Sequence, residues 1–128
     1  FVTKLRNVRM SDTSTILDVI NAGIRAENLR QKAIASNVAN LETPGYRRVD
    51  INFEDLLAKA IKKPGPFDPA AVEPEVFQPE TTPVKANGND VSLEAEIGQM
   101  VKNTLRHKTY VRLLQKKYAQ MEMAMNVK

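Results

Sequence analysis

Proline most limits how this chain can fold, because it is concentrated in one stretch. Six of the twenty residues from Pro64 to Pro83 are proline. Proline lacks a backbone N–H and fixes φ, so this stretch is excluded from α-helix and from the middle of any sheet. We therefore predict an extended segment there, which is mobile unless it docks on other parts of the chain. Long regular elements have to lie before or after it.

The chain before the prolines has the apolar spacing of a long amphipathic helix over residues 12–41. Six of eight positions spaced three and four apart are apolar, which is the spacing of a coiled-coil seam. These positions are Leu17, Ile20, Ile24, Glu27, Gln31, Ile34, Val38 and Leu41. Asp12 or Ser14 is suited to cap the N-terminus of this helix.

The chain after the prolines predicts a second long helix over residues 92–126. Eight of ten positions at the same spacing are apolar. They are Leu93, Ile97, Met100, Thr104, His107, Val111, Leu114, Tyr118, Met121 and Met125. Ser92 is a suitable N-cap, and Glu94 and Glu96 lie in the first turn, where the helix dipole favours negative charge.

Polar residues interrupt both apolar seams near their middles. Glu27 and Gln31 interrupt the first seam, and Thr104 and His107 interrupt the second. We interpret these interruptions as facing each other and fixing the register of the two helices. Two such helices cannot bury both of their faces in a chain of 128 residues, so part of the apolar surface is predicted to remain for other copies or partners.

Short elements are predicted in the middle of the chain. Residues 43–45 (Thr-Pro-Gly) and 87–90 (Asn-Gly-Asn-Asp) have the composition of turns. Residues 46–51 are rich enough in β-branched and aromatic side chains for a short strand or extended piece. Residues 53–61 are compatible with a short amphipathic helix capped by Asn52.

The predicted fold class is mostly α. Two long terminal helices pair as a coiled-coil-like hairpin, joined by a proline-rich irregular middle with a short helix and minor β structure. The chain divides into a basic N-terminal extension over residues 1–9, whose origin the sequence leaves open, an N-terminal helix within 10–41, a middle over 42–90 and a C-terminal helix within 91–128.

Several classes of site are disfavoured by composition. The chain has no cysteine, which excludes a disulfide framework, a thiolate zinc site and a cysteine nucleophile. His107 is the only histidine, so a multi-histidine metal site is excluded as well. No apolar run approaches the ~20 residues of a membrane span, and no cleavable secretory signal is visible. We predict a protein that is not an enzyme, with no catalytic, cofactor-binding or metal site.

The basic character of the last helix supports one alternative function. Six cations lie along it: Lys102, Arg106, Lys108, Arg112, Lys116 and Lys117. A helical module that binds nucleic acid or an acidic partner through this helix is therefore an alternative. Tyr110 and Tyr118 are the only aromatic residues among the cations, and this weakens that alternative because few bases could stack there.

The most specific motif lies at the end of the first helix. An Asn-x-x-Asn pair is followed by Thr-Pro-Gly-Tyr, with the motif residues Asn37, Asn40, Thr43, Pro44, Gly45 and Tyr46. The two asparagines are three residues apart, so both amides can reach the same side of the helix end. Thr43-Pro44 stops the helix, Gly45 turns the chain, and Tyr46 is expected to return to the helix end or to an adjacent subunit.

This motif resembles the N-terminal signature of the flagellar rod and hook family of axial proteins. Residues 47–53 and 88–94, and Ala124-Met125-Asn126 near the C-terminus, are similar to the proximal-rod branch of that family. The resemblance extends over about residues 13–126.

The resemblance implies a structural subunit of the bacterial flagellar rod, the shaft that crosses the periplasm and transmits motor torque. It implies as partners the other rod proteins, the adaptor at the rod base, the membrane ring protein and the flagellar type III export apparatus, and export without a cleaved signal peptide. It implies neither a nucleic-acid partner nor a membrane span. The residues expected to pack the helices and the assembly are Leu17, Ile20, Ile24, Ile34, Val38, Val111, Leu114, Tyr118 and Met121.

Overall fold

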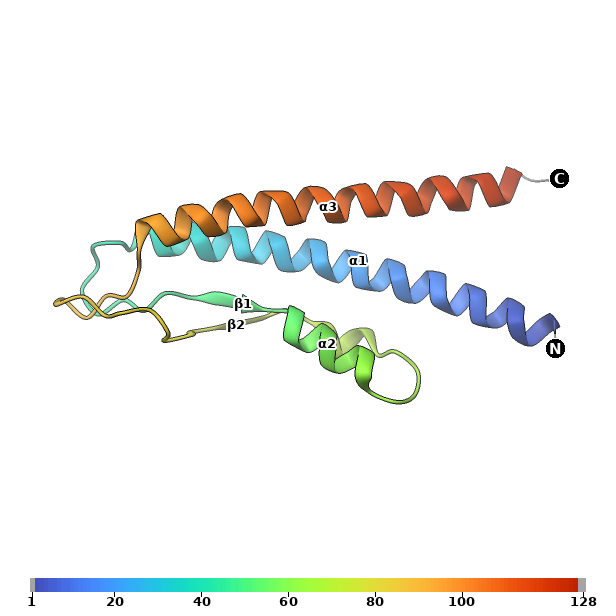
Figure 1. The fold of residues 1–128 in the computed structure, drawn as a ribbon, viewed down its shortest axis with the longest axis horizontal. Helices are drawn as coiled ribbons and strands as arrows, with labels where there is room; N and C mark the ends of the chain where they lie inside the picture. Colours follow the sequence, from blue (N-terminus) through green and yellow to red (C-terminus); the bar gives the residue numbers. More distant parts are fainter. Residues whose placement is uncertain (1, 127–128) are drawn as a thin grey trace.

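The protein forms a hairpin of two long helices with a small α/β layer on one side (Figure 1). The computed structural model describes the backbone of residues 2–126 and the side chains of residues 13–126. The elements in chain order are α1 (Val2–Ala39), β1 (Asp50–Asn52), α2 (Glu54–Lys62), the 3-10 helix η1 (Pro69–Val72), β2 (Glu75–Phe77) and α3 (Leu93–Asn126). The predicted fold class, mostly α with two long helices and minor β structure in the middle, is confirmed.

α1 and α3 are antiparallel. The facing pairs are Gly23 with Tyr110, Glu27 with Asn103, and Asn37 with Glu96. Residue numbers thus rise along α1 as they fall along α3. The two helices lie close together at the end where the chain turns and diverge toward the start of α1 and the end of α3 (Figure 1). The hairpin is therefore closed at one end and open at the other.

The first helix differs from its predicted bounds at both ends. It begins at Val2 instead of residue 12, because residues 2–22 contain neither glycine nor proline to stop it. Ser14 consequently lies inside the helix and does not cap it, while the side chains of Asp12 and of the extension 1–9 lie outside the described residues. At its other end α1 stops at Ala39, where the Asn40 amide donates to the Ser36 carbonyl, 2.8 Å away.

The cap predicted for the short helix is wrong. α2 begins at Glu54, and the residue before it is Phe53, which provides no side-chain cap. Asn52 instead belongs to β1. Phe53 is completely buried, and its carbonyl accepts the first helical hydrogen bond from the Leu57 N–H at 2.8 Å. Core packing of an aromatic ring thus sets the start of this helix.

The proline-rich segment is docked on α1. β2 pairs with β1 in an antiparallel two-stranded sheet in which Ile51 lies opposite Val76, so neither strand is central. One helical turn does form there, because Pro69 occupies the first position of η1, where its missing N–H costs nothing. Val72 at the end of η1 is completely buried and anchors the segment.

The core lies mainly between α1 and the middle of the chain. Its buried members are Ala22, Ala26, Ala33, Ile51, Phe53 and Val72. Half of them are alanines of α1, so neighbouring elements approach the helix backbone closely. Tyr110 of α3 packs against the same cluster from the other side.

Gly23 provides the closest approach between the two helices. A Cβ added there would lie 2.5 Å from Cζ and 2.8 Å from Cδ1 of Tyr110. We expect Gly23→Ala to lower the free energy of unfolding by about 1–2 kcal/mol, because overpacking outweighs the gain in helix propensity. Urea denaturation followed by circular dichroism measures this.

Gly98 of α3 is the matched control, because nothing lies within 4 Å of its added Cβ. Gly98→Ala should raise the free energy of unfolding by up to about 1 kcal/mol. Equal gains at Gly23 and Gly98 would contradict the close packing at Gly23.

No helix in the described part of the chain has both the length and the apolar character needed to cross a bilayer.

Candidate assembly interface

Asn37 is the centre of the motif at the end of α1. It is completely buried. Its Oδ1 accepts hydrogen bonds from the Val49 N–H at 2.9 Å and from the Tyr46 hydroxyl at 3.1 Å. Its Nδ2 donates to the Val49 carbonyl at 2.9 Å and to Glu96 Oε2 at 3.2 Å. One side chain therefore joins α1, the extended segment before β1, and α3.

The rest of the motif joins two loops, residues 40–46 and 85–91, which we call the clasp. Asn89 Nδ2 donates to the carbonyls of Asn40 and Thr43 at 2.8 and 2.9 Å. The Gly45 N–H donates to the Asn87 carbonyl at 2.9 Å. Gly45 has a φ of 75°, which favours glycine. Because only Ser92 separates the clasp from the start of α3 at Leu93, the clasp sets where α3 begins relative to the end of α1.

A layer of buried charge lies next to the clasp. Glu96 is completely buried, and its Oε1 accepts from Arg48 Nε at 2.8 Å. The Arg48 backbone N–H donates to Asp90 Oδ1 at 2.6 Å, and Arg47 Nε lies 3.2 Å from Asp90 Oδ2. Burial alone would lower the pKa of Arg48, but hydrogen bonding and attraction to Glu96, together with those to Asp50, outweigh burial and raise the pKa.

A second charged layer lies midway along the hairpin, around the completely buried Glu27. Glu27 pairs with Arg30, accepts from Asn103 Nδ2 at 2.8 Å and accepts from Arg106 Nε at 3.0 Å. Arg30 also donates to Glu54 of α2 at 2.8 Å. This layer therefore ties α1 to α3 on one side and to α2 on the other.

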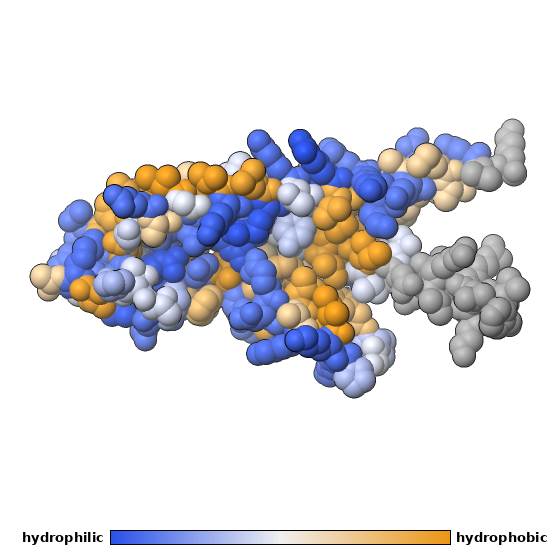
Figure 2. Space-filling model, in the orientation of Figure 1, coloured by the Kyte–Doolittle hydropathy of each residue, from blue (hydrophilic) through white to orange (hydrophobic). Residues whose placement is uncertain are grey.

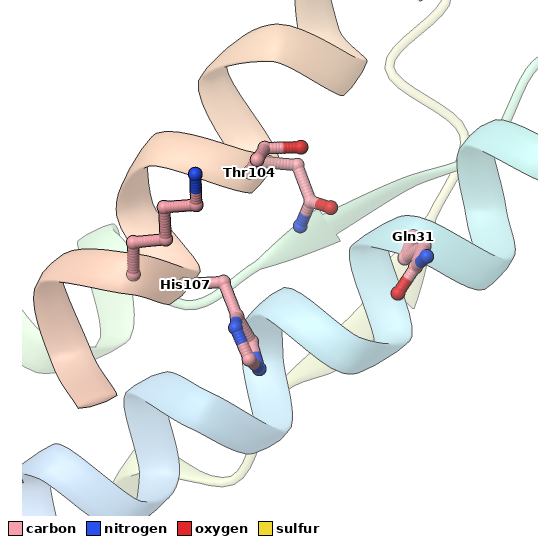
Figure 3. Close-up of a pocket in the computed structure, with 5 residues that line it drawn as sticks. Gln31, Thr104 and His107 are labelled. Atoms are coloured by element: carbon pink, nitrogen blue, oxygen red, sulfur yellow. The ribbon is translucent and has the colours of Figure 1, made fainter.

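The other predicted interruptions surround a polar pocket of about 220 Å³ between α1 and α3. Figure 3 shows Gln31 on one helix, with Thr104 and His107 on the other. Asn103 and Lys108 complete the lining. The structure thus brings the interruptions of the two helices to one level, but the partners of Glu27 are Asn103 and Arg106, which the sequence interpretation did not identify.

The inner face of α3 is offset from the predicted apolar seam. Glu96, Asn103, Tyr110 and Lys117 recur every seven residues, and all four are buried or half-buried. That regular spacing is the signal that could have identified this face. The polar members can lie inside because each of the buried ones, Glu96 and Asn103, finds partners on α1 or in the segment before β1.

The predicted packing residues fall into three groups. Ile20 and Ile34 are buried. Half-buried are Leu17, Ile24, Val38, Val111 and Leu114. Tyr118 and Met121 are exposed. All five predicted positions on α1 are thus buried or half-buried, whereas Tyr118 and Met121 near the end of α3 are exposed.

A row of exposed apolar side chains lies on the N-terminal half of α3. We call it the α3 stripe, and its members are Leu93, Ile97, Met100, Val101 and Leu105. Figure 2 shows apolar residues along this edge of the molecule. Contiguous apolar surface of this kind marks an interaction site. The N-terminal half of α3 thus turns Glu96 and Asn103 inward and an apolar row outward.

Tyr110, which packs over Gly23, should titrate late. Burial raises its pKa above the usual 10.0, and the nearby charges of Glu54 and Glu27 raise it further. The unfolded chain then loses this proton at a lower pH than the native protein, so stability should fall as pH rises through 10. The Tyr110→Phe variant should lack this loss of stability. Urea denaturation of both proteins at a series of rising pH values measures the difference. Parallel pH dependence of both proteins would contradict the assignment.

No group of three or more His, Asp or Glu side chains within the described residues is arranged to hold a metal ion.

Comparison with known proteins places this hairpin in a family. A model of the flagella basal body rod protein family matches residues 17–47, which include the whole motif. The chain is 27% identical over 115 residues to flagellar basal body rod protein FlgB of Bacillus subtilis, covering 83% of this chain and 88% of that protein. It is 30% identical over 110 residues to FlgB of Cereibacter sphaeroides, covering 74% of this chain and 85% of that protein.

A shorter stretch is similar to a second rod protein. Over 47 residues the chain is 34% identical to flagellar basal-body rod protein FlgG of Buchnera aphidicola, covering 37% of this chain and 18% of that protein. The similarity to FlgB, by contrast, extends over most of both chains. The chain belongs to the FlgB family of flagellar basal body rod proteins.

Proposed function

We propose that this protein is a structural subunit of the bacterial flagellar basal body rod, where it assembles with other rod proteins. The observation that carries the proposal is the arrangement of side chains on α3. Its buried Glu96 and Asn103 find partners inside the subunit, while the α3 stripe stays exposed. A subunit that forms a shaft by lateral packing needs such an outward apolar face.

The finer role follows from family membership together with this surface. The subunit occupies the proximal part of the rod, contacts the rod-base adaptor and the membrane ring, and contributes to the transmission of torque. It reaches the rod through the flagellar type III export apparatus without a cleaved signal peptide. Its role is mechanical and involves no catalysis.

Assembly contacts are proposed for the exposed part of the packing set. Tyr118 and Met121 on α3 extend the apolar surface toward the open end of the hairpin. Leu17, Ile24, Val38, Val111 and Leu114 are half-buried and contribute to both the hairpin and its neighbours. The motif residues act within the subunit, by holding the clasp.

The nucleic-acid alternative gains no support from this surface. A nucleic-acid site needs exposed cations, whereas the N-terminal half of α3 exposes the apolar α3 stripe.

A clean in-frame deletion tests the proposal. Deleted cells should lack hook and filament and should not swim, and expression of the intact chain in trans should restore both. Electron microscopy of isolated basal bodies and swimming in soft agar are the measurements. A deleted strain with normal flagella would contradict a role in the rod.

A further inference from the structure

An apolar groove lies on the open side of the hairpin, apart from the α3 stripe. It has a volume of about 410 Å³ and is enclosed by α1, α3 and the chain around the end of α2. Its apolar lining includes Ile16, Val19, Ile20, Ile61, Phe67 and Leu113. Figure 2 shows apolar residues running from α3 toward α2 across this part of the molecule.

Large side chains in this groove are exposed to water in the single chain. The exposed fraction is 66% for Ile61, 43% for Leu113 and 38% for Ile16. Each exposed apolar side chain favours binding of an apolar surface, at about 25 cal/mol for each Å² removed from water. A volume of about 410 Å³ is within the range of sites that accept several apolar groups at once.

The rim of the groove is basic. Lys117 lines it, Lys116 is its neighbour on α3, and Lys62 and Lys63 follow Ile61 directly at the end of α2. None of these four lysines has an ion-pair partner in the described part of the chain. Two acidic residues, Asp18 and Asp68, are likewise sequence neighbours of lining residues. Four lysines thus stand against two aspartates, and the groove combines an apolar floor with a net positive surround.

We propose that this groove binds an acidic amphipathic helix of another protein. The floor would take the apolar face of that helix, and the four lysines would face the carboxylates on its flanks. The α1 and α3 walls run lengthwise along the groove, so a helix laid between them completes a three-helix arrangement. This inference deepens the proposed function, on which it rests, because it specifies the chemistry of one partner in the rod.

A second copy of this chain fits the groove less well. Beside the α3 stripe, one exposed glutamate, Glu94, stands against Lys102 and Lys108, so the stripe is net positive and would repel the lysines beside the groove. The acid-rich stretch between Pro64 and Asp90 contains no helix longer than η1. A bilayer surface does not enter a concave groove, and a nucleic-acid backbone gains nothing from an apolar floor.

A designed peptide tests the proposal with the whole purified chain. The peptide has leucine on one helical face and glutamate on the other, over about 18 residues or five turns. A second peptide carries lysine in place of glutamate. We expect the glutamate peptide to bind at least about tenfold more tightly by fluorescence anisotropy, with an affinity that falls as salt rises. Equal binding of the two peptides, or no binding of the glutamate peptide, would overturn the proposal.

Two substitutions locate the binding site. Ile61→Asp places a carboxylate at an exposed wall position and should weaken binding of the glutamate peptide at least about tenfold. Leu105→Asp makes the same kind of change at a position that is 61% exposed on the α3 stripe and should leave binding unchanged. If Leu105→Asp weakened binding and Ile61→Asp did not, the peptide would bind the α3 stripe, and the proposed groove site would be wrong.

The competing occupants are tested on the same protein. Sedimentation of the unmodified chain that shows self-association abolished by Ile61→Asp would identify a second copy as the occupant and overturn the proposal. Tighter binding of phosphatidylglycerol vesicles or of a single-stranded oligonucleotide than of the glutamate peptide would also overturn it. These outcomes leave the deletion phenotype untouched, so failure of the groove assignment is distinguishable from failure of the rod assignment.

Discussion

Glu27→Ala should lower the free energy of unfolding by about 3 kcal/mol, the largest loss that we expect from any single substitution. The side chain is completely buried and joins Arg30, Asn103 and Arg106. Removing its charge leaves the two arginines facing each other across the space between α1 and α3. Urea denaturation followed by circular dichroism measures the change. The expected loss is a large share of the 5–15 kcal/mol by which ordinary domains are stable.

Two further variants show that the effect comes from the buried charge. Glu27→Gln keeps the shape of the side chain and an acceptor for Asn103, so it should lose less than Glu27→Ala. Glu122→Ala changes an exposed glutamate on α3 and should move the free energy of unfolding by no more than about 0.5 kcal/mol. If Glu27→Ala and Glu122→Ala had equal effects, the charged layer would not hold the hairpin together.

The double variant Ile97→Asp, Val101→Asp should abolish rod assembly while leaving the subunit folded. These side chains are 52% and 56% exposed on the α3 stripe, so the substitutions remove little contact within the chain. In an assembled rod, the substitutions would bury two uncompensated carboxylates in an apolar interface. Each buried carboxylate would weaken the contact with a neighbouring subunit by several kcal/mol. The measurements are swimming in soft agar and rod formation seen by electron microscopy, beside urea denaturation of the purified variant.

Ala95→Asp is the matched control for this variant. Ala95 is exposed on the same helix and lies two residues before Ile97, about 200° around the helix, so it faces away from the α3 stripe. Its neighbours one turn away are Ser92, Gly98 and Gln99, so the new carboxylate meets no apolar row and cells carrying it should swim normally. Normal swimming by the double variant as well would show that the α3 stripe is not an assembly surface.

The fold was predictable where a single pattern decides the structure. Periodic apolar residues identify the two long helices, and the dense prolines identify a middle without long elements. Where two patterns compete, sequence reasoning failed. Two rows run side by side on α3: one is apolar, and the other contains Glu96, Asn103 and Tyr110. The second row faces inward in the structure. Its buried members are stabilised there by Asn37, Arg48 and Glu27, and such long-range partners are not visible in local spacing.

Local capping rules failed for a related reason. Asn52 has the better side chain for a helix cap, but Phe53 starts α2 because its ring is buried in the core. The groove was also hidden from the sequence, because its walls come from α1, α3 and the end of α2. Only the motif at the end of α1 combined local chemistry with local partners, since Tyr46 returns to Asn37 only nine residues away.

The separation of the paired residues along the chain also determines when the hairpin can form. Glu27 reaches Asn103 across 76 residues, and Asn37 reaches Glu96 across 59. Contacts of such high contact order form late, because the entropy of closing a long loop opposes them until most of the chain is present. When the chain is made from its N-terminus, Glu27 cannot pair with Asn103 and Arg106 until α3 has been synthesised. The contacts that join α1 to α3 therefore form only after most of the chain is present, and until then both buried charge layers lack their partners on α3.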